Sequence, residues 1–562
     1  MNKFFILTSS FLVLCISMWA GPVGKEQAQQ KAIVFLNEQQ AGSQHGQRAP
    51  IQLSSLSVAK TGSSAYYVFN VGEKNGFVIV SGDDQTEPIL GYAEEGRFNI
   101  DEAPENMLAW LKEYEKQIKW VQENGIVRKS TPRRAAKAAI SPMIKSKWNQ
   151  RRPYNLYCYN ETGQWYAVTG CVATAMAQIM YYHQWPKQTK VGIPAFNIDY
   201  QTEETSYTYT WEAQPATTFA WSSMQDTYSL NEDLELTDAT TQDKAVAKLM
   251  RYCGQSVKMR YGENASGASS NSATTAFVKY FGYDEDLHLV KRDKYKDDWD
   301  ELIYSELADG RPVMYGGATE SGGGHSFIVD GYKDGMFSIN WGWSGNHDGY
   351  FLLTALDPDD DGQTGASSGG YNYRQDAIIG IQKPDGVNVV DRRLTINSLT
   401  PSADYDFMID FNVVNDCGIE GTYDYGVVAI DNQGNIKKIL AVIETKAVFA
   451  IEESHYTDEY PFMPERTAED TEDYVITLAS KLSDADSYEV CIGWEKNRLI
   501  AKPEHYYSNA FTIVEYEEPV ITGIRDQLNE SAKGVWYNLN GMRVEQPTKG
   551  VYIRDGKKVV LK

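Results

Sequence analysis

The sequence has few cysteines, no excess of positive charge and no second long apolar run, and each absence excludes a class of protein. Six cysteines in 562 residues are too few for a disulfide scaffold. The formal net charge of -23 argues against nucleic acid as a partner. Beyond residues 1–20, no stretch is apolar enough to be expected to cross a bilayer.

The N-terminus, in contrast, has a pattern typical of export. Residues 1–20 combine Lys3, an apolar run and a small residue at Ala20, which is the pattern of a secretory signal peptide. An uncleaved membrane anchor is the alternative, although the run is short for a spanning helix. We expect an exported protein that is secreted or attached to the cell surface. Loss of this segment would remove Cys15 and leave an odd number of cysteines, so at least one thiol is free.

The rest of the chain is predicted to form several globular domains. Its hydrophobic content of 42% and aromatic content of 12% are those of well-packed domains, and its length is too great for a single one. In the first unit, residues 25–40 have helical periodicity and residues 104–124 form a strongly amphipathic helix. Between them, residues 65–71 and 76–80 flank a turn and predict a hairpin.

A basic segment follows this first unit. Residues 128–137, RKSTPRRAAK, are rich in small residues and lack periodicity in an otherwise acidic chain. Such a segment is expected to be exposed and readily cut by proteases, although an ordinary interdomain linker would have a similar composition. We therefore predict a compact α+β domain over residues 21–140, joined to the next domain by a cleavable tether.

The next predicted helix begins at a cysteine. In residues 170–183, GCVATAMAQIMYYH, apolar residues recur at helical spacing from Val172 to Ile179. The positive partial charge and unpaired N–H groups of a helix N-terminus favour a thiolate, so Cys171 lies where a nucleophile would be placed. By itself, a cysteine in a helix is more often a small buried hydrophobic residue.

A second group of chemically suggestive residues lies far downstream. Three glycines lead into His325 and a short β-type run, and a turn at residues 333–335 precedes a second run that reaches Asn340. A hairpin with near-equal arms would bring Asn340 back beside His325, and the glycines would let a substrate backbone approach closely. Alone, each residue could be structural, as a hydrogen-bonded histidine or a strand cap. Together with Cys171 they follow the order of a papain-type Cys-His-Asn site.

Several further motifs make this region similar to the streptopain family of secreted, papain-fold cysteine peptidases, which are made as inhibited zymogens. The motifs, in chain order, are Trp148-Asn149-Gln150, Pro153-Tyr154-Asn155, Gly170 to Ala175, Tyr261-Gly262 to Ser270, Gly324 to Phe327, Asn340 to Trp343 and Gly369 to Asn372. Their number and order make the resemblance specific. It implies a papain-like, α+β cysteine peptidase domain over residues 141–383.

The resemblance also implies a role for each catalytic residue. Cys171 would be the nucleophile, and His325 would deprotonate it or hold it as a thiolate–imidazolium pair, then protonate the leaving amine. Asn340 would orient the imidazole, and Trp341 would pack over the histidine and shield this contact from water. The backbone N–H of Cys171 and the side-chain amide of Gln150 would stabilise the oxyanion, by about 3 kcal/mol per donor.

The family further implies a substrate cleft and an intramolecular inhibitor. The loop that contains Ser266 and Gly267 would line the cleft together with Gly324, and relatives favour an apolar residue two positions before the cleaved bond. Residues 21–140 correspond to the family's pro-domain, which would be released by cleavage near residues 137–140. The implied function is a cysteine endopeptidase that hydrolyses host or nutrient proteins and peptides and needs no cofactor.

Two other functions remain open at this point. A transglutaminase-like acyl transferase uses the same apparatus with an amine in place of water, and a non-catalytic surface adhesin could retain a papain-like domain. No metal site is expected. Asp357, Asp359 and Asp361 have the spacing that opens a calcium loop, but Ser368 stands where a glutamate is needed. We interpret this segment as a solvated acidic loop.

The region after the peptidase domain is predicted to be all β. Within residues 386–518, side chains from Phe407 to Val413 alternate between apolar and polar, and turn signals recur. This pattern favours an immunoglobulin-like β-sandwich, across which Cys417 and Cys491 could pair.

The tail, residues 525–562, is predicted to form two hairpins around the turn pairs Asn540-Gly541 and Asp555-Gly556. It resembles the C-terminal sorting domains of type IX secretion substrates in its Leu-Asn-Gly, Lys-Gly-Val-Tyr and terminal Lys-Val-Val features. The secretion machinery would then be a partner, and the tail would be removed or used for surface attachment. Alternatively, these strands are the last hairpins of the sandwich.

Overall fold

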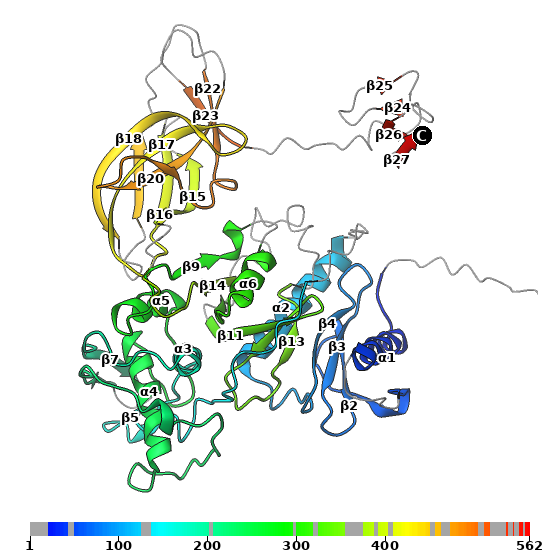
Figure 1. Ribbon diagram of the computed structural model, residues 1–562, viewed down its shortest axis with the longest axis vertical. Helices are drawn as coiled ribbons and strands as arrows, with labels where there is room; N and C mark the ends of the chain where they lie inside the picture. The colour runs from blue at the N-terminus through cyan, green and yellow to red at the C-terminus, as the bar shows by residue number, and fades with distance from the viewer. Residues whose placement is uncertain are drawn as a thin grey trace, which may run out of the picture.

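The structure, a computed structural model, describes most of the chain, from the first helix to the last hairpin (Figure 1). The described residues are 21–42, 50–124, 137–201, 206–295, 299–318, 324–354, 375–386, 392–402, 408–449, 456–461, 473–503, 511–516, 536–537, 543–544, 550–554 and 557–561. The predicted signal peptide, most of the basic segment, the acidic loop at 357–361 and the motif at 369–372 lie outside them.

The first unit is a small antiparallel sheet with a helix on each face, and its predicted helices and hairpin are confirmed. The sheet contains β1 (Leu56–Val58), β2 (Tyr66–Val71), β3 (Phe77–Ser81) and β4 (Ile89–Ala93), and the short helix η1 (Leu53–Ser55) precedes it. Helix α1 (Lys25–Gly42) packs against one face through Ala28, Ala32 and Leu36. Helix α2 (Glu105–Asn124) packs against the other through Trp110, Leu111 and Tyr114.

This sheet does not end with the first unit. Strand β4 pairs with β13 (Gly349–Phe351), so that Tyr92 lies opposite Tyr350 and Gly91 opposite Phe351. One sheet of ten strands therefore runs through both units, in the order β1-β2-β3-β4-β13-β12-β11-β10-β14-β9. The sequence predicted only a tether between the units, whereas the structure joins them by backbone pairing as well.

The second unit supplies the remaining strands of this sheet and a helical layer. Its strands are β9 (His288–Lys291), β10 (Val313–Ala318), β11 (Gly324–Lys333), β12 (Met336–Asn340) and β14 (Gln375–Ile379). On one face, α6 (Trp299–Ala308) shares a core with α2 of the first unit. On the other face lie α3 (Cys171–His183), α4 (Thr241–Ser256) and α5 (Ser270–Lys279), which form a second core. The result is a mixed α/β fold in which two cores meet at the strands β10, β11 and β14.

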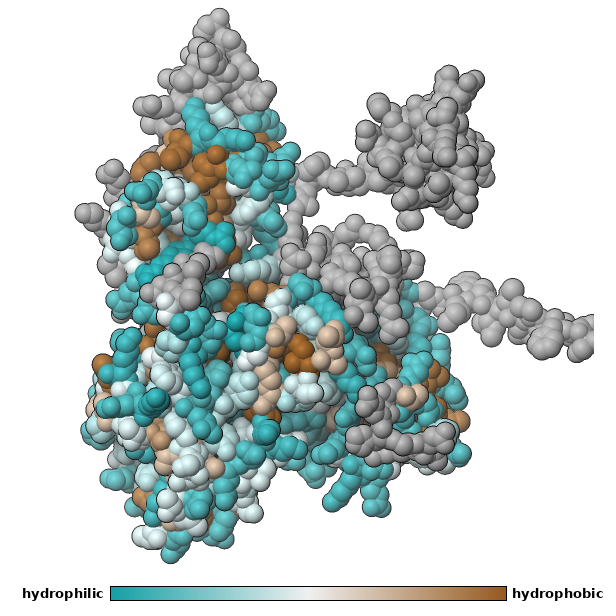
Figure 2. Space-filling model, viewed as in Figure 1, coloured by the Kyte–Doolittle hydropathy of each residue, from teal (hydrophilic) through white to brown (hydrophobic). Residues whose placement is uncertain are grey.

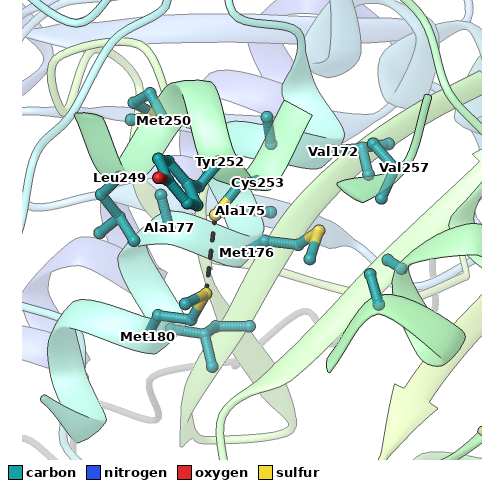
Figure 3. Packing of buried hydrophobic residues seen from close by; sticks show 14 of the residues in the cluster. Val172, Ala175, Met176, Ala177, Met180, Leu249, Met250, Tyr252, Cys253 and Val257 are labelled. Atoms are coloured by element: carbon teal, nitrogen blue, oxygen red, sulfur yellow. Dashed lines mark hydrogen bonds between the residues drawn. The ribbon is translucent and has the colours of Figure 1, made fainter. Parts of the chain in front are cut away.

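Helix α3 is held at the centre of the helical layer. Figure 3 shows Val172, Ala175, Met176 and Met180 directed into the packed interior, where α4 supplies the facing side chains. The Cys253 thiol contacts the Met180 sulfur at 3.6 Å. Residues 172–180 of α3 are all buried, so packing fixes both the position and the rotation of the helix. Smaller elements around it are β5 (Tyr159–Asn160), β6 (Trp165–Tyr166), β7 (Phe196–Gln201), β8 (Ser206–Trp211), η2 (Trp221–Ser223) and η3 (Arg292–Lys294).

The third unit is built from two antiparallel sheets that share one core. One sheet contains β15 (Thr395–Pro401), β16 (Met408–Val414) and β19 (Tyr456–Pro461). The other contains β17 (Gly421–Ile430), β18 (Ile436–Phe449), β20 (Tyr474–Leu482), β21 (Glu489–Val490), β22 (Leu499–Pro503) and β23 (Phe511–Glu515). Ile409, Phe411 and Val413 are buried, as the alternation predicted. Cys417 and Cys491 are both buried and neither is in a disulfide, so the possible bridge between them is not formed.

The edge strand β18 contributes exposed apolar side chains to this unit's surface. Figure 2 shows hydrophobic side chains gathered on the sandwich, above a mainly hydrophilic face of the two preceding units. Ile439 and Val442 of β18 are 44% and 49% exposed. The tail forms the two predicted hairpins, because β24 (Trp536–Tyr537) pairs with β25 (Arg543–Val544) and β26 (Gly550–Arg554) with β27 (Lys557–Leu561). Among the described helices, none has the length and apolar character that a membrane span requires.

Candidate active site

Cys171 is the first residue of α3, and the residue before it explains this position. Gly170 precedes the helix with φ of +86°, a conformation that residues with a side chain rarely adopt. A Cβ at this glycine would also lie 2.6 Å from the sulfur of Met259. The thiol of Cys171 is free and partly exposed, at the end of a helix whose N–H groups point toward it.

The surroundings of the thiol nevertheless favour its neutral form. Burial raises the pKa of Cys171, while the backbone groups of Ser326 and Val172 favour the thiolate and the carboxylate of Glu105 opposes it. The desolvation effect is the largest of these. The helix N-terminus alone therefore does not activate this thiol.

His325 lies on β11, one residue from the strand's start, and pairs with Gly317 of β10. Side chains alternate along a strand. Phe327 and Val329 of β11 pack in the core shared with α2, whereas Ile328 packs in the core formed with α3. His325 therefore shares a face with Phe327 and points to the side of α2. Burial lowers the pKa of His325, and Glu105 partly opposes this effect.

The structure does not show a thiolate–imidazolium pair among the described residues. Within the described part of the chain, no hydrogen bond joins His325 to Cys171 or to Asn340. Both titratable groups are shifted toward their neutral forms. The site holds the predicted nucleophile and the predicted base without the contact that would activate them.

Asn340 does not lie beside His325, contrary to the expectation from equal hairpin arms. The register of β11 and β12 places Asn340 opposite Ile328, three residues further along β11. The reason is that His325 lies eight residues before Lys333, whereas Asn340 lies only four residues after Met336, the partner of Lys333, and an irregularity between Val329 and Gly331 shifts the register by one more residue. The Asn340 amide donates to the carbonyl of Ser146 at 2.9 Å, and its oxygen accepts from Gly342 N–H at 3.0 Å.

Gln178 is the main partner of Asn340 and was not predicted. Its Nε2 donates to Asn340 Oδ1 at 3.1 Å, and its Oε1 accepts from the Ser146 hydroxyl at 3.0 Å and from Trp148 N–H at 3.2 Å. Gln178 is fully buried, two turns after Cys171 on α3. A polar residue on an otherwise apolar, buried helix could have indicated such a role, because a buried amide needs hydrogen-bond partners.

Trp341 packs in the core that the two units share. Its ring centroid lies 4.9 Å from that of Phe327 and 5.3 Å from that of Phe351. Its indole N–H donates to the carbonyl of His347 at 3.0 Å, and its own carbonyl accepts from the side chain of Asn106 at 2.8 Å. In this state, Trp341 covers Phe327, the neighbour of His325 on the same face of β11.

Gln150 and the predicted cleft residues surround the start of α3. Gln150 is buried, and its carbonyl accepts from Thr169 N–H, two residues before Cys171. The Ser266 hydroxyl donates to the carbonyl of Val168 at 2.7 Å, so it fixes the loop. Gly267 is exposed and pairs with Arg260. Gly324 begins β11, opposite Ala318. The structure thus brings Gln150 and the Ser266 loop to the backbone next to Cys171.

The N-terminus of α2 lies over this site. Glu105, the first residue of α2, acts electrostatically on both Cys171 and His325, and Asn106 holds the carbonyl of Trp341. Neither residue was predicted from the sequence, because they lie outside the peptidase motifs. No group of three or more His, Cys, Asp or Glu side chains suited to a metal ion occurs among the described residues.

Comparisons with known proteins agree with this architecture. Residues 148–351 match the Peptidase C10 family, and residues 20–118 match the Spi protease inhibitor family. Streptopain from Streptococcus pyogenes is 34% identical over 385 residues, which cover 64% of this chain and 91% of streptopain. The thiol protease/hemagglutinin PrtT of Porphyromonas gingivalis is 34% identical over 393 residues, covering 67% of this chain but only 44% of that protein.

Two solved structures from Prevotella intermedia are also similar to the chain. A prointerpain A fragment is 29% identical, with a TM-score of 0.47, and covers 58% of this chain and 99% of its own. Active wild-type interpain A is 32% identical, with a TM-score of 0.35, and covers 44% and 96%. The peptidase match includes Cys171, His325 and Asn340, and the inhibitor match includes α1, β1 to β4 and the first part of α2. With nearly the whole of streptopain matched at 34% identity, the chain belongs to the peptidase C10 family of cysteine peptidases and carries an N-terminal inhibitor-like pro-domain.

Proposed function

We propose that the chain is the zymogen of an exported cysteine endopeptidase. Cys171 would attack the substrate carbonyl as a thiolate after its proton passes to His325. The amine would leave with a proton from His325, and water would then hydrolyse the thioester to release the acid and restore the thiol. Asn340 would orient the imidazole, and Gln150 and the Cys171 N–H would hold the oxyanion.

The observation that carries this proposal is the position of the α2 N-terminus. Asn106 binds the carbonyl of Trp341, and Glu105 acts on both the thiol and the imidazole, while these two groups share no hydrogen bond in the described structure. A pro-domain that keeps Cys171 and His325 apart would inhibit the enzyme without any covalent change to either residue. Its removal would let His325 turn toward Cys171 and let Trp341 take its place over the histidine.

The proposed processing site follows from the segment that enters the peptidase unit. Ile140 pairs with Tyr332 of β11 through two backbone hydrogen bonds of 2.8 Å, and the Tyr304 hydroxyl donates to the carbonyl of Ala138 at 3.1 Å. Ala138 and Ala139 are exposed. Cleavage near residues 137–140 would leave the segment after it anchored to the peptidase and end its covalent link to the chain before it.

The substrates would be host or nutrient proteins, and the remaining units would serve export and localisation. Residues 386–518, as an immunoglobulin-like sandwich, would act as a packing or tethering module, and the hairpins of residues 525–562 would engage a type IX secretion system. The signal-like N-terminus supports export, and the Leu-Asn-Gly and Lys-Gly-Val-Tyr features support the sorting role.

Mass spectrometry of the secreted wild type and of Cys171→Ala tests the proposal. We expect removal of the signal, cleavage between residues 125 and 145, and loss of that cleavage in the variant when no active enzyme is added. Casein should yield new N-termini with the wild type only, and an epoxide inhibitor should label Cys171. Incorporation of an amine without new N-termini would instead support an acyl transferase. If active enzyme never cuts Cys171→Ala between residues 125 and 145, the processing proposal is wrong.

A further inference from the structure

A carboxylate lies on the sheet surface near the nucleophile, outside the residues assigned so far. Asp376 of β14 pairs with Gly316 of β10, and Gly316 pairs with Ser326 of β11. Directly paired residues of antiparallel strands present their side chains on the same face. Asp376 therefore lies on the face of Ser326, whose backbone is close enough to the Cys171 thiol to favour its ionised form.

The absence of a side chain at Gly316 lets this carboxylate extend toward the nucleophile. A Cβ at Gly316 would be 2.4 Å from Asp376 Oδ1 and 3.1 Å from the Ser270 hydroxyl oxygen. The carboxyl oxygen thus occupies the space above β10, about one strand spacing, or about 5 Å, from Ser326. Ser270 is the first residue of α5 and follows the loop of Ser266 and Gly267, which the family resemblance assigns to the substrate cleft.

One oxygen of the Asp376 carboxylate accepts no hydrogen bond from the described residues. Oδ1 of Asp376 is buried and has no hydrogen-bond partner, although the residue as a whole remains partly exposed. A buried acceptor without a donor is costly. A donor that arrives with a ligand would therefore be bound favourably, and a cationic donor most strongly.

The charged neighbours of Asp376 do not neutralise it by direct contact. Lys291 of β9 is its cross-strand partner and favours the ionised carboxylate. The Lys291 ammonium, however, donates to Asn397 Oδ1 of the sandwich at 3.2 Å, and no ion pair joins it to Asp376 in the described structure. Asp416 adds a second negative charge to this region. Lys294 acts on Asp416 in turn, so Lys291 and Lys294 balance the two carboxylates, and the attraction for a ligand rests on the unpartnered Oδ1 of Asp376.

We propose that Asp376 is a specificity-determining residue. It binds a lysine or arginine side chain at the second position before the cleaved bond of the substrate. The spacing supports this position. An extended peptide advances about 3.3 Å per residue, and the carboxylate lies about one strand spacing, or about 5 Å, beyond Ser326, whose backbone contacts the thiol. The proposal rests on the proposed function, and it differs from the apolar preference that the family resemblance implies at the second position before the cleaved bond.

The preference should also depend on pH. Burial raises the pKa of Asp376 to about 6, opposed by Lys291 and the nearby Ser270. The carboxylate is then ionised at neutral pH and protonated below about pH 6. Discrimination between basic and apolar residues, taken as a ratio of kcat/KM values, should therefore fall as the pH drops through this range, whatever the pH dependence of catalysis itself.

The test is cleavage profiling of the processed enzyme on a proteome-derived peptide library. It is followed by kcat/KM measurements on paired peptides that differ only at the second position before the cleaved bond. Wild type should favour Lys or Arg over Val by about tenfold or more at pH 7.5, since a hydrogen bond to a charged group contributes on this scale. Asp376→Asn, which keeps the shape and removes the charge, should lose this preference. Gly316→Ala, which keeps the carboxylate but displaces it, should weaken it.

The matched control is Asp309→Asn, which removes an equal charge at the end of α6, where the Asp309 side chain is 62% exposed. This control should retain the wild-type preference. An Asp376→Asn enzyme with the wild-type preference, or a wild type without a basic preference, overturns the inference. Failure of the proposed function is separate, because it would appear as a wild type whose cleavage is absent or does not depend on Cys171.

Discussion

Asn106 of the pro-domain donates its side-chain amide to the carbonyl of Trp341, 2.8 Å away in space and 235 residues away in sequence. Trp341 is also the residue after Asn340 and the neighbour of Phe327. One hydrogen bond thus ties the inhibitor-like unit to the strand end that carries the proposed orienting residue. The contact supports a form of the proposed inhibition that acts on the position of the strands carrying the predicted catalytic residues, and not only on access to the thiol.

The first prediction concerns this hydrogen bond. Asn106→Ala removes a buried donor to Trp341 and should weaken pro-domain docking by about 1 kcal/mol, or about fivefold. Full-length Asn106→Ala should then process itself about fivefold faster than wild type, measured by densitometry at a fixed concentration. Gln122→Ala, an exposed amide on the same helix, is the control and should process at the wild-type rate. Equal rates for both variants would contradict the role of Asn106.

The second prediction concerns His347, which lies between the two units. Its ring is 5.6 Å from that of Phe98 and 5.9 Å from that of Phe77, and its Nε2 accepts from Asn99 N–H at 3.4 Å. Burial lowers the pKa of His347, while the carboxylate of Glu102 opposes the shift. The docked state therefore favours the neutral imidazole. The docking free energy should be fully present above the ordinary histidine pKa of about 6.5 and decrease as the pH falls below it.

This pH dependence can be measured without interference from catalysis. In a Cys171→Ala background, an added protease cuts the basic tether, and dissociation of the pro-domain is followed by gel filtration between pH 5 and 8. Dissociation should increase toward pH 5 with His347 present and become nearly independent of pH in this range with His347→Phe. His183→Gln is the control, because His183 is half-buried and contacts Tyr283, not the pro-domain. A His347→Phe variant that retains the full pH dependence would refute the assignment.

The third prediction concerns Gln178, which joins α3 to Asn340, Ser146 and Trp148. Gln178→Leu leaves buried polar groups unpaired and should lower the free energy of unfolding by about 1–3 kcal/mol. Because Asn340 loses the partner that fixes its amide, kcat of the processed enzyme should fall more than KM rises. Urea denaturation and steady-state kinetics at a temperature where both proteins are folded give the two quantities. Gln242→Ala, exposed on α4, is the control and should change neither.

Local patterns in the sequence predicted what depends on neighbouring residues. The helix at Cys171, the hairpin after His325 and the alternation around Phe411 follow from periodicity and turn residues, and the structure confirms each of these elements. The strand partner of Asn340 could not be found in this way, since the register also depends on the irregularity between Val329 and Gly331 of β11. A one-residue change of register alters which residue lies opposite.

Contacts between segments that are distant in the sequence could not be predicted either. Strand β13 has three residues, GYF, with no alternation long enough to predict a strand, and its partner β4 lies in the other unit. The position of Asp376 over Gly316 depends on the order of β14, β10 and β11 in the sheet. Such pairings join residues far apart in the chain, and short-range propensity carries no information about them.

The last prediction follows from the shared sheet. Cleavage of the tether leaves the pairing of β4 with β13 and the core around Trp110 and Trp341 intact, so the cut pro-domain should remain bound. Dissociation would expose this apolar core to water, at a cost of about 25 cal/mol per Å². After the tether of Cys171→Ala is cut, both fragments should elute together from a gel-filtration column at neutral pH.

A substitution in the pairing itself should separate the fragments. A Cβ at Gly91 would lie 2.5 Å from the Phe351 ring and 3.0 Å from the carbonyl of Tyr350, so Gly91→Ala must push β4 away from β13. We expect the cut fragments of Gly91→Ala to elute apart, and the full-length active form to process itself faster, although Gly91 is not among the proposed catalytic residues. Gly24→Ala is the control, because a Cβ there meets no atom within 4 Å. Cut wild-type fragments that separate at once would mean that the tether, and not the sheet, holds the pro-domain in place.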